Sequence, residues 1–211
     1  TTGGYNTAVG SSALTSSTTA ARGVAFGYGA LDTVTTGDDN VGIGVFAGAA
    51  ITTGADNTIV GNYSADQVTT GIQNSTLGYQ ALTRCTTGGN NACVGYKAGD
   101  NVTTGSANVC VGKEAGTNIT QGDNNVCVGP ETQTSGEAVA NCIAIGHDIS
   151  ASAANTFSFG KSSNVVSNTF TSDATWSRSS DINKKTNIEN TDLGLSFINE
   201  LKPVTFNWKP N

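Results

Sequence analysis

Residues 108–124 read Asn-Val-Cys-Val-Gly-Lys-Glu-Ala-Gly-Thr-Asn-Ile-Thr-Gln-Gly-Asp-Asn, and residues 125–129 begin the same unit again as Asn-Val-Cys-Val-Gly. The glycine in the fifth position recurs without a break at every seventeenth position, as Gly10, Gly27, Gly44, Gly61, Gly78, Gly95, Gly112, Gly129 and Gly146. Self-similarity at a fixed short period is typical of solenoids, in which each unit packs only on its neighbours. The sequence therefore predicts a solenoid in which each unit forms one coil.

Other positions of the unit keep the same period. An apolar residue precedes each of these glycines, and a second apolar column stands seven positions after the glycine, at Val34, Ile51, Val68, Cys85, Val102 and Ile119. Asparagine recurs four positions before the glycine, at Asn6, Asn40, Asn57, Asn74, Asn91, Asn108 and Asn125. β-branched residues bounded by Gly and Asn favour short strands and tight turns. We expect two short strands and two turns in each coil, with the Asn side chains hydrogen bonded from coil to coil.

The alternation of side chains along a strand separates two faces. The residues one and three before the repeat glycine share one face, and the residue between them lies on the other. We expect the apolar residue before the glycine to line the core. The residues of the other face are small, and Ile59 is the one bulky exception. The small ones are Ala8, Ala25, Gly42, Thr76, Cys93, Cys110, Cys127 and Ala144.

These small residues suggest that another chain approaches closely, which predicts a homotrimer of parallel β-rolls wound side by side. A three-faced helix of a single chain is the alternative. It would need three evenly spaced apolar ladders in each unit, and the sequence shows two strong ones.

The charge balance argues against two classes of partner. The formal net charge is −6 and 12% of the residues are charged, so we expect no nucleic-acid binding by a basic surface. The sequence has no apolar run long enough to span a membrane, and we expect no membrane insertion. The chain starts with neither Met nor a signal peptide, so we expect a piece of a longer extracellular or virion fibre.

Cysteine and aspartate, which often form disulfides or metal sites, occur here at positions of the repeat. The cysteines occupy repeat columns rather than a metal-ligand spacing, so we expect small apolar fillers, with disulfides as the alternative: Cys85, Cys93, Cys110, Cys127 and Cys142. Asp residues at turns next to Asn suggest calcium only weakly, because the Gly- and Asp-rich nonapeptide pattern is absent. We expect no metal and no cofactor.

The position directly after the repeat glycine is variable, and in one coil it is the only histidine of the sequence, His147. A position that also accepts Ser, Val, Lys and Pro indicates a solvent-facing side chain rather than a catalytic one. Tyr28, Tyr79 and Tyr96 share this column. They suit stacking on a sugar ring, although scattered surface aromatics are the simpler interpretation.

The repeats resemble the head repeats of trimeric autotransporter adhesins. Asn40-Val41-Gly42-Ile43-Gly44 and the corresponding unit at 108–112 carry the likeness, which covers residues 3–160. The resemblance implies a trimeric parallel β-roll.

The repeat breaks after Gly146, because the next apolar-Gly step, Phe159-Gly160, comes only fourteen positions later. We expect three segments: the 17-residue-repeat roll at 1–160, an extended β neck at 161–179, and a domain of different composition at 180–211. In the last segment, 192–201 favours a short helix and 202–208 a strand.

The start of this last segment resembles the autocleaving intramolecular chaperones at the C-termini of phage tail fibres, tailspikes and neck appendages. The matching residues are Ser180, Asp181, Lys185, Asn187, Ile188, Leu201, Pro203, Val204, Phe206 and Trp208. The resemblance implies the start of a small α+β chaperone domain that trimerises the fibre and then cuts itself off. Carried over by position, Ser179-Ser180 is the scissile bond, Ser180 the nucleophile and Lys185 the base. Asn183 departs from the Arg often found there, and the family's domain is longer than 180–211.

Together these features predict a structural and receptor-binding trimeric fibre of a phage virion, whose trimerisation and register are set by the self-cleaving chaperone. Its expected partners are its own copies and a glycan or protein receptor on the host surface. A trimeric bacterial adhesin at the cell surface is the alternative. A glycan depolymerase is less favoured, because glycosidases use paired carboxylates and short coils offer no groove for them. We expect no turnover enzyme, only a single autoproteolytic cut.

Overall fold

The computed structural model describes residues 2–170, which belong to the first of two compact units, Thr1–Ala174. The predicted helix at 192–201, the strand at 202–208 and the cleavage site at Ser179-Ser180 lie outside the described residues.

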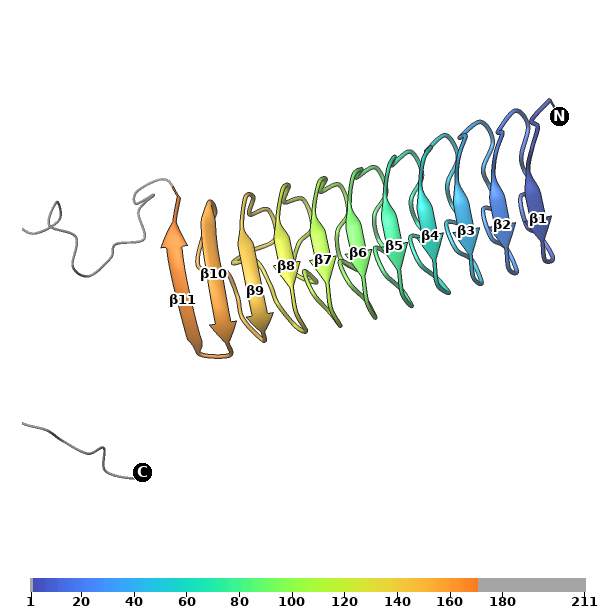
Figure 1. Ribbon diagram of the computed structural model, residues 1–211. Helices are drawn as coiled ribbons and strands as arrows, with labels where there is room; N and C mark the ends of the chain where they lie inside the picture. The colour runs from blue at the N-terminus through green and yellow to red at the C-terminus, as the bar shows by residue number, and fades with distance from the viewer. Residues whose placement is uncertain (1, 171–211) are drawn as a thin grey trace, which may run out of the picture. The chain divides into compact units, whose positions relative to one another are not determined.

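The described residues form one 11-stranded sheet whose strands follow sequence order (Figure 1). Neighbouring strands from β1 to β10 run parallel, and β11 pairs antiparallel with β10. The strands are β1 (Thr7–Val9), β2 (Val24–Phe26), β3 (Val41–Ile43), β4 (Thr58–Val60), β5 (Ser75–Leu77), β6 (Ala92–Val94), β7 (Val109–Val111), β8 (Val126–Val128), β9 (Ile143–His147), β10 (Thr156–Lys161) and β11 (Asn164–Thr169).

The pairing confirms the predicted solenoid. From β1 to β9 each residue pairs with its equivalent in the next repeat unit, as in Cys93↔Cys110 and Cys110↔Cys127. Residues 2–170 contain no helix, so the all-β class is also confirmed. At a strand spacing of about 4.8 Å, nine such coils extend for roughly 43 Å.

Each coil contains one strand, so the prediction of two strands was wrong. After the strand the chain turns through left-handed residues such as Phe46 (φ 54°) and Leu82 (φ 56°), and no strand forms at the Thr-Thr-Gly segment. That segment still bonds coil to coil. The Thr86 N–H and hydroxyl donate to the Thr103 carbonyl at 2.8 and 3.2 Å. Because both bonds go to the same carbonyl, the contact between coils is too narrow to form a strand.

The two faces of the strand are the reverse of the prediction. From β2 to β9 the residue two before the repeat glycine is buried, including Ala25, Ile59 and Cys110 at 0% exposure. The residue directly before the glycine lies outside, with Phe26 57% and Leu77 53% exposed. The interior of the coils already contains large residues from their other sides, such as Leu31, Ile51 and Leu82 at 0% exposure, so close packing leaves room for the small column of the strand and not for the large one.

Large and small residues compensate one another inside the coils. A Cβ on Gly42 would lie 2.7 Å from Cγ of Leu31, and one on Gly99 would lie 2.8 Å from Sγ of Cys93. The second predicted apolar column is confirmed, because it is buried from Val34 to Ile119. Since the small column fills the core, it offers no contact to another chain, and the predicted homotrimer does not follow from it.

The predicted asparagine ladder is confirmed. Asn91 donates its backbone N–H and its Nδ2 to Oδ1 of Asn74 at 3.0 and 3.1 Å, and Nδ2 also donates to the Gly105 carbonyl at 3.0 Å. Its own Oδ1 accepts the same pair of bonds from Asn108. The ladder ends where Cys142 takes the asparagine position and donates only its N–H to Asn125. Buried amide groups thus fix the coil spacing along one edge of the core.

A hairpin closes the described part of the chain. β10 continues the parallel sheet from β9, and β11 turns back along it, so that Lys161 pairs with Asn164. The Ser158 and Ser167 hydroxyls lie 2.7 Å apart. An antiparallel edge strand cannot continue the one-way coil ladder, which ends the repeat at this side. The segment boundaries at 160 and 179 stay predictions.

Candidate functional surfaces

The predicted catalytic residues Ser180 and Lys185 lie outside the described residues. Their roles in cleavage therefore stay predictions. The described residues carry three surfaces that bear on function: the outward side of the sheet, a stripe of aromatic residues and a cavity at the first coil.

The repeat glycines have a structural role. Gly95 has φ +135°, and a Cβ placed on it would lie 2.5 Å from the carbonyl oxygen of Gly112 in the next coil. The other repeat glycines also have positive φ values and stack on the carbonyl of the following one. The repeat thus positions the flanking columns but supplies no reactive group of its own.

The outward side of the sheet, here called the outer face, consists of the residues one and three before each repeat glycine in β1 to β9. The column directly before the glycine is Val9, Phe26, Ile43, Val60, Leu77, Val94, Val111, Val128 and Ile145. The column three before it is Thr7, Val24, Val41, Thr58, Ser75, Ala92, Val109, Val126 and Ile143. Neither column contains a charged residue. Every side chain of the outer face is exposed or half-buried in the single chain, which makes it an extended apolar surface.

An aromatic stripe runs along the turns that follow the strands: Tyr28, Phe46, Tyr63, Tyr79 and Tyr96. Consecutive ring centroids are 5.1 to 6.1 Å apart. Only Tyr28, Tyr79 and Tyr96 share a repeat column in the sequence, because Phe46 and Tyr63 stand one position later in their coils. The two adjacent positions lie at the same corner of the coil. The aromatic residues therefore form a continuous stripe, where the sequence predicts scattered surface aromatics. Lys97 places its Nζ 5.5 Å from the centroid of Tyr96 and adds a cation–π contact at its end.

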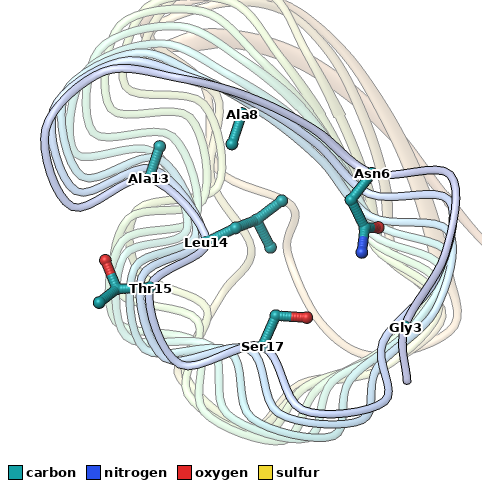
Figure 2. Close-up of a pocket in the computed structure, with 7 residues that line it drawn as sticks. All are labelled: Gly3, Asn6, Ala8, Ala13, Leu14, Thr15 and Ser17. Carbon is teal, nitrogen blue, oxygen red and sulfur yellow. The ribbon is translucent and has the colours of Figure 1, made fainter. Parts of the chain in front are cut away.

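A cavity opens at the first coil, where the interior meets solvent. It is lined by Gly3, Asn6, Ala8, Ala13, Leu14, Thr15 and Ser17. Figure 2 shows Asn6, Ala8 and Leu14 pointing into the ring that the coil makes. Its lining contains no acid, base or thiol, so the cavity is the open end of the core rather than a catalytic pocket.

All five cysteines are buried and free, as expected for small apolar fillers. Burial raises the pKa of Cys85 to about 11 and also raises the pKa of Cys127. The pKa of Cys110 is raised by its contact with Cys93 and by burial. The thiols of Cys85, Cys110 and Cys127 are therefore protonated at neutral pH. All five side chains are buried inside the coils, so they cannot reach another chain.

The aspartates near the turns are used within the fold. Asp38 accepts a hydrogen bond from the Ala21 N–H at 2.8 Å, and Asp123 accepts one from the Ser106 N–H at 2.7 Å. The Arg22 guanidinium lowers the pKa of Asp39 through a side-chain hydrogen bond. Over residues 2–170, no three His, Cys, Asp or Glu side chains come together as metal ligands. His147 is exposed, as predicted.

No helix within residues 2–170 is long and apolar enough to cross a membrane.

Comparison with protein families places the last segment of the chain beside a known family. Residues 180–211 match the family described as chaperone of endosialidase. This agrees with the resemblance that the sequence showed over the same residues. Comparison with curated proteins and with solved structures gives no match. A β-solenoid followed by a chaperone-like segment fits a structural protein of the tail-fibre kind, while the likeness to adhesin heads stays a prediction.

Proposed function

We propose that the chain is the shaft of a trimeric phage fibre, whose chains are aligned by the segment that begins at Ser180. The observation that carries the proposal is the order of the two parts: an unbroken 17-residue solenoid precedes a match to a chaperone family at 180–211. The solenoid supplies an elongated repetitive body, and the chaperone-like segment supplies what such a body needs for assembly.

The need arises from the repeat itself. Coils that differ little from one another present nearly the same contacts, so a chain displaced by one coil keeps most of its partners. Association of separate chains is also slow, because the contacts between them are not local in sequence. A trimerising segment at one end would fix the register of all the coils at once, and its later removal would make the assembly hard to reverse.

The proposed cut uses groups within the chain. A neutral Lys185 amine takes the Ser180 hydroxyl proton as Oγ attacks the carbonyl carbon of Ser179. The new C–O ester bond replaces the C–N peptide bond, and the proton passes to the released amine of Ser180. Water then hydrolyses the ester. The lysine acts as a base only if its surroundings lower its pKa.

Replacing Ser180 by alanine is expected to abolish the cut, because the nucleophile is removed. Mass spectrometry of the purified protein should show a chain ending at Ser179 for the wild type and only uncut chain for Ser180→Ala. Ser179→Ala is the matched control, since it removes the neighbouring hydroxyl but keeps the scissile carbonyl, and it should still be cut. A Ser180→Ala chain cut at the same bond would contradict the proposed mechanism.

The proposed receptor is a glycan or protein on the host surface, and the exposed aromatic stripe supports this role. Aromatic rings stack on sugar rings and are enriched at interfaces. Replacing both Tyr79 and Tyr96 by serine is expected to weaken binding to host cells about tenfold, measured with labelled protein, if the rings contribute about 1.4 kcal/mol. Tyr5→Ser is the control, because Tyr5 is 92% exposed outside the stripe. Equal binding by all three proteins would argue against the stripe.

The alternative is a trimeric adhesin on a bacterial surface, where the same shaft would serve adhesion rather than virion attachment. Immunolabelling separates the two, because a virion fibre lies on purified particles and an adhesin on cells.

A further inference from the structure

We propose that the outer face is the surface on which copies of this chain pack against one another along the shaft. The inference rests on the proposed fibre and adds the interface. The face consists of the side chains one and three before each repeat glycine, from Thr7 to Ile145.

An apolar residue recurs at an exposed position of the outer face. The residue before the repeat glycine is apolar in every coil, although the single chain leaves Phe26, Leu77 and Val94 at 57%, 53% and 39% exposure. Another exposed column is also constant, with Thr at Thr36, Thr53, Thr70, Thr87 and Thr104, but its residue is polar, so the constant apolar character is what distinguishes the outer face. Parallel sheets are ordinarily covered on both faces. A sheet that is apolar on its core side and on its outer side indicates a second layer that the single chain does not supply.

Charged residues surround the outer face but do not lie on it. The charged residues of the described coils lie at the turns and along the other sides, as do Arg22, Asp100, Lys113 and Glu131. The outer face contains none, and its polar members are only Thr7, Thr58 and Ser75. Such a surface offers few hydrogen-bonding groups to a glycan. Depletion of charge at an apolar centre with a charged surround is the composition of a protein–protein interface.

A second copy of the chain matches the outer face in shape. The outer face is one strand wide, and its rows repeat with the strand spacing from β1 to β9. A second copy has rows at the same spacing, so every row can meet an equivalent row when the chains run in parallel and in register. A surface that is not built of stacked strands lacks this period. The same match explains why register is ambiguous by one coil and needs an outside reference.

The outer face runs the length of the coils. Nine rows at about 4.8 Å and a width of about 10 Å give on the order of 430 Å² per chain. This is about half of the roughly 800 Å² that one partner buries in a standard interface. The apolar surface also continues beyond the coils, because Phe159 on β10 and Val166 on β11 are 38% and 50% exposed.

The test introduces charge into the face of the full chain. Leu77→Lys and Val94→Lys together should convert a trimer into monomers, measured by sedimentation equilibrium, because three copies would bring these charges together at the axis. Both side chains point outward, so the β-sheet circular dichroism of the single chain should be kept. Asn90→Lys with Asn124→Lys is the matched control, since both positions are exposed and share the column of Arg22, and it should remain trimeric.

Hydroxyl-radical footprinting of the wild-type protein tests the same interface without a variant. Leu77 on the outer face and Ile72 on a turn are 53% and 44% exposed in the single chain. Burial between chains predicts several-fold less modification of Leu77 than of Ile72, and equal modification would overturn the proposal.

The outcomes separate the interface from the fibre. A trimer that persists in the Leu77→Lys/Val94→Lys variant overturns the proposed interface and leaves the fibre intact. A wild-type full chain that is monomeric overturns both. A folded monomer for this variant, with a trimeric control, supports both.

Discussion

Gly95→Ala is expected to lower the melting temperature by about 10 °C. The new Cβ would lie 2.5 Å from the carbonyl oxygen of Gly112 and 2.7 Å from its carbon. Both atoms belong to the backbone of the next coil, which cannot rotate away as a flexible side chain can. Relief requires the coils to separate, which stretches the 2.8 Å bond from the Gly112 N–H to the Val94 carbonyl.

The cost has two parts. Alanine at a φ of +135° is strained by about 1–3 kcal/mol, and forced overpacking costs about 1–3 kcal/mol more. For a chain of this length, about 4 kcal/mol corresponds to a shift on the order of 10 °C. Thermal unfolding followed by circular dichroism measures the shift. Gly136→Ala is the control, because a Cβ there meets only Cγ2 of Val139 at 3.4 Å. Equal melting temperatures for the two variants would contradict this account of the glycine column.

Asn91→Asp is expected to destabilise the protein by about 3–5 kcal/mol at neutral pH, whereas Asn90→Asp should be almost neutral. The Nδ2 of Asn91 donates to Oδ1 of Asn74 and to the Gly105 carbonyl. An aspartate would turn a carboxylate oxygen toward these two acceptors in a buried site. Asn90 is exposed in a column that already contains Asp39 and Asp56, so the control adds the same charge to a tolerant position.

The difference between these variants depends on pH. Burial beside acceptors raises the pKa of the new carboxyl at residue 91 above its unfolded value of roughly 4, so the folded state favours the protonated form. The stability difference should therefore be small below about pH 4 and grow as the pH rises. Urea unfolding at several pH values measures it, and the Asn90→Asp control cancels the titration of the other groups. A constant difference from acidic to neutral pH would be inconsistent with a buried charge at residue 91.

The period of the sequence was sufficient to predict the ladder elements of the fold. Gly95 and its equivalents mark the coils, and Asn91 and its equivalents form the predicted amide ladder. The column from Val34 to Ile119 lies in the core, as expected. Identical residues at identical spacing must stack in a solenoid, so these contacts follow from sequence alone.

The candidate surfaces were less predictable. The sequence predicts the small column, including Cys93 and Cys110, at a chain contact, whereas the structure places it in the core. The tyrosines are scattered in the sequence pattern, because Phe46 and Tyr63 belong to a different column. A column follows a single position of the repeat unit, whereas a turn places side chains from two neighbouring positions at the same corner of the coil.

The sequence by itself determined the 17-residue solenoid, its glycine and asparagine ladders and the chaperone-like segment from Ser180. Only the tertiary structure decided which side of the strand is inside. Alternation along a strand separates two faces but does not show which of them points into the core. That choice depends on which way the chain curls after the repeat glycine and on how much volume one coil encloses. Beside the buried Leu, Ile and Val side chains, the interior accepts mainly Ala and Cys from the strands, and it leaves Phe26, Leu77 and their equivalents on the outer face.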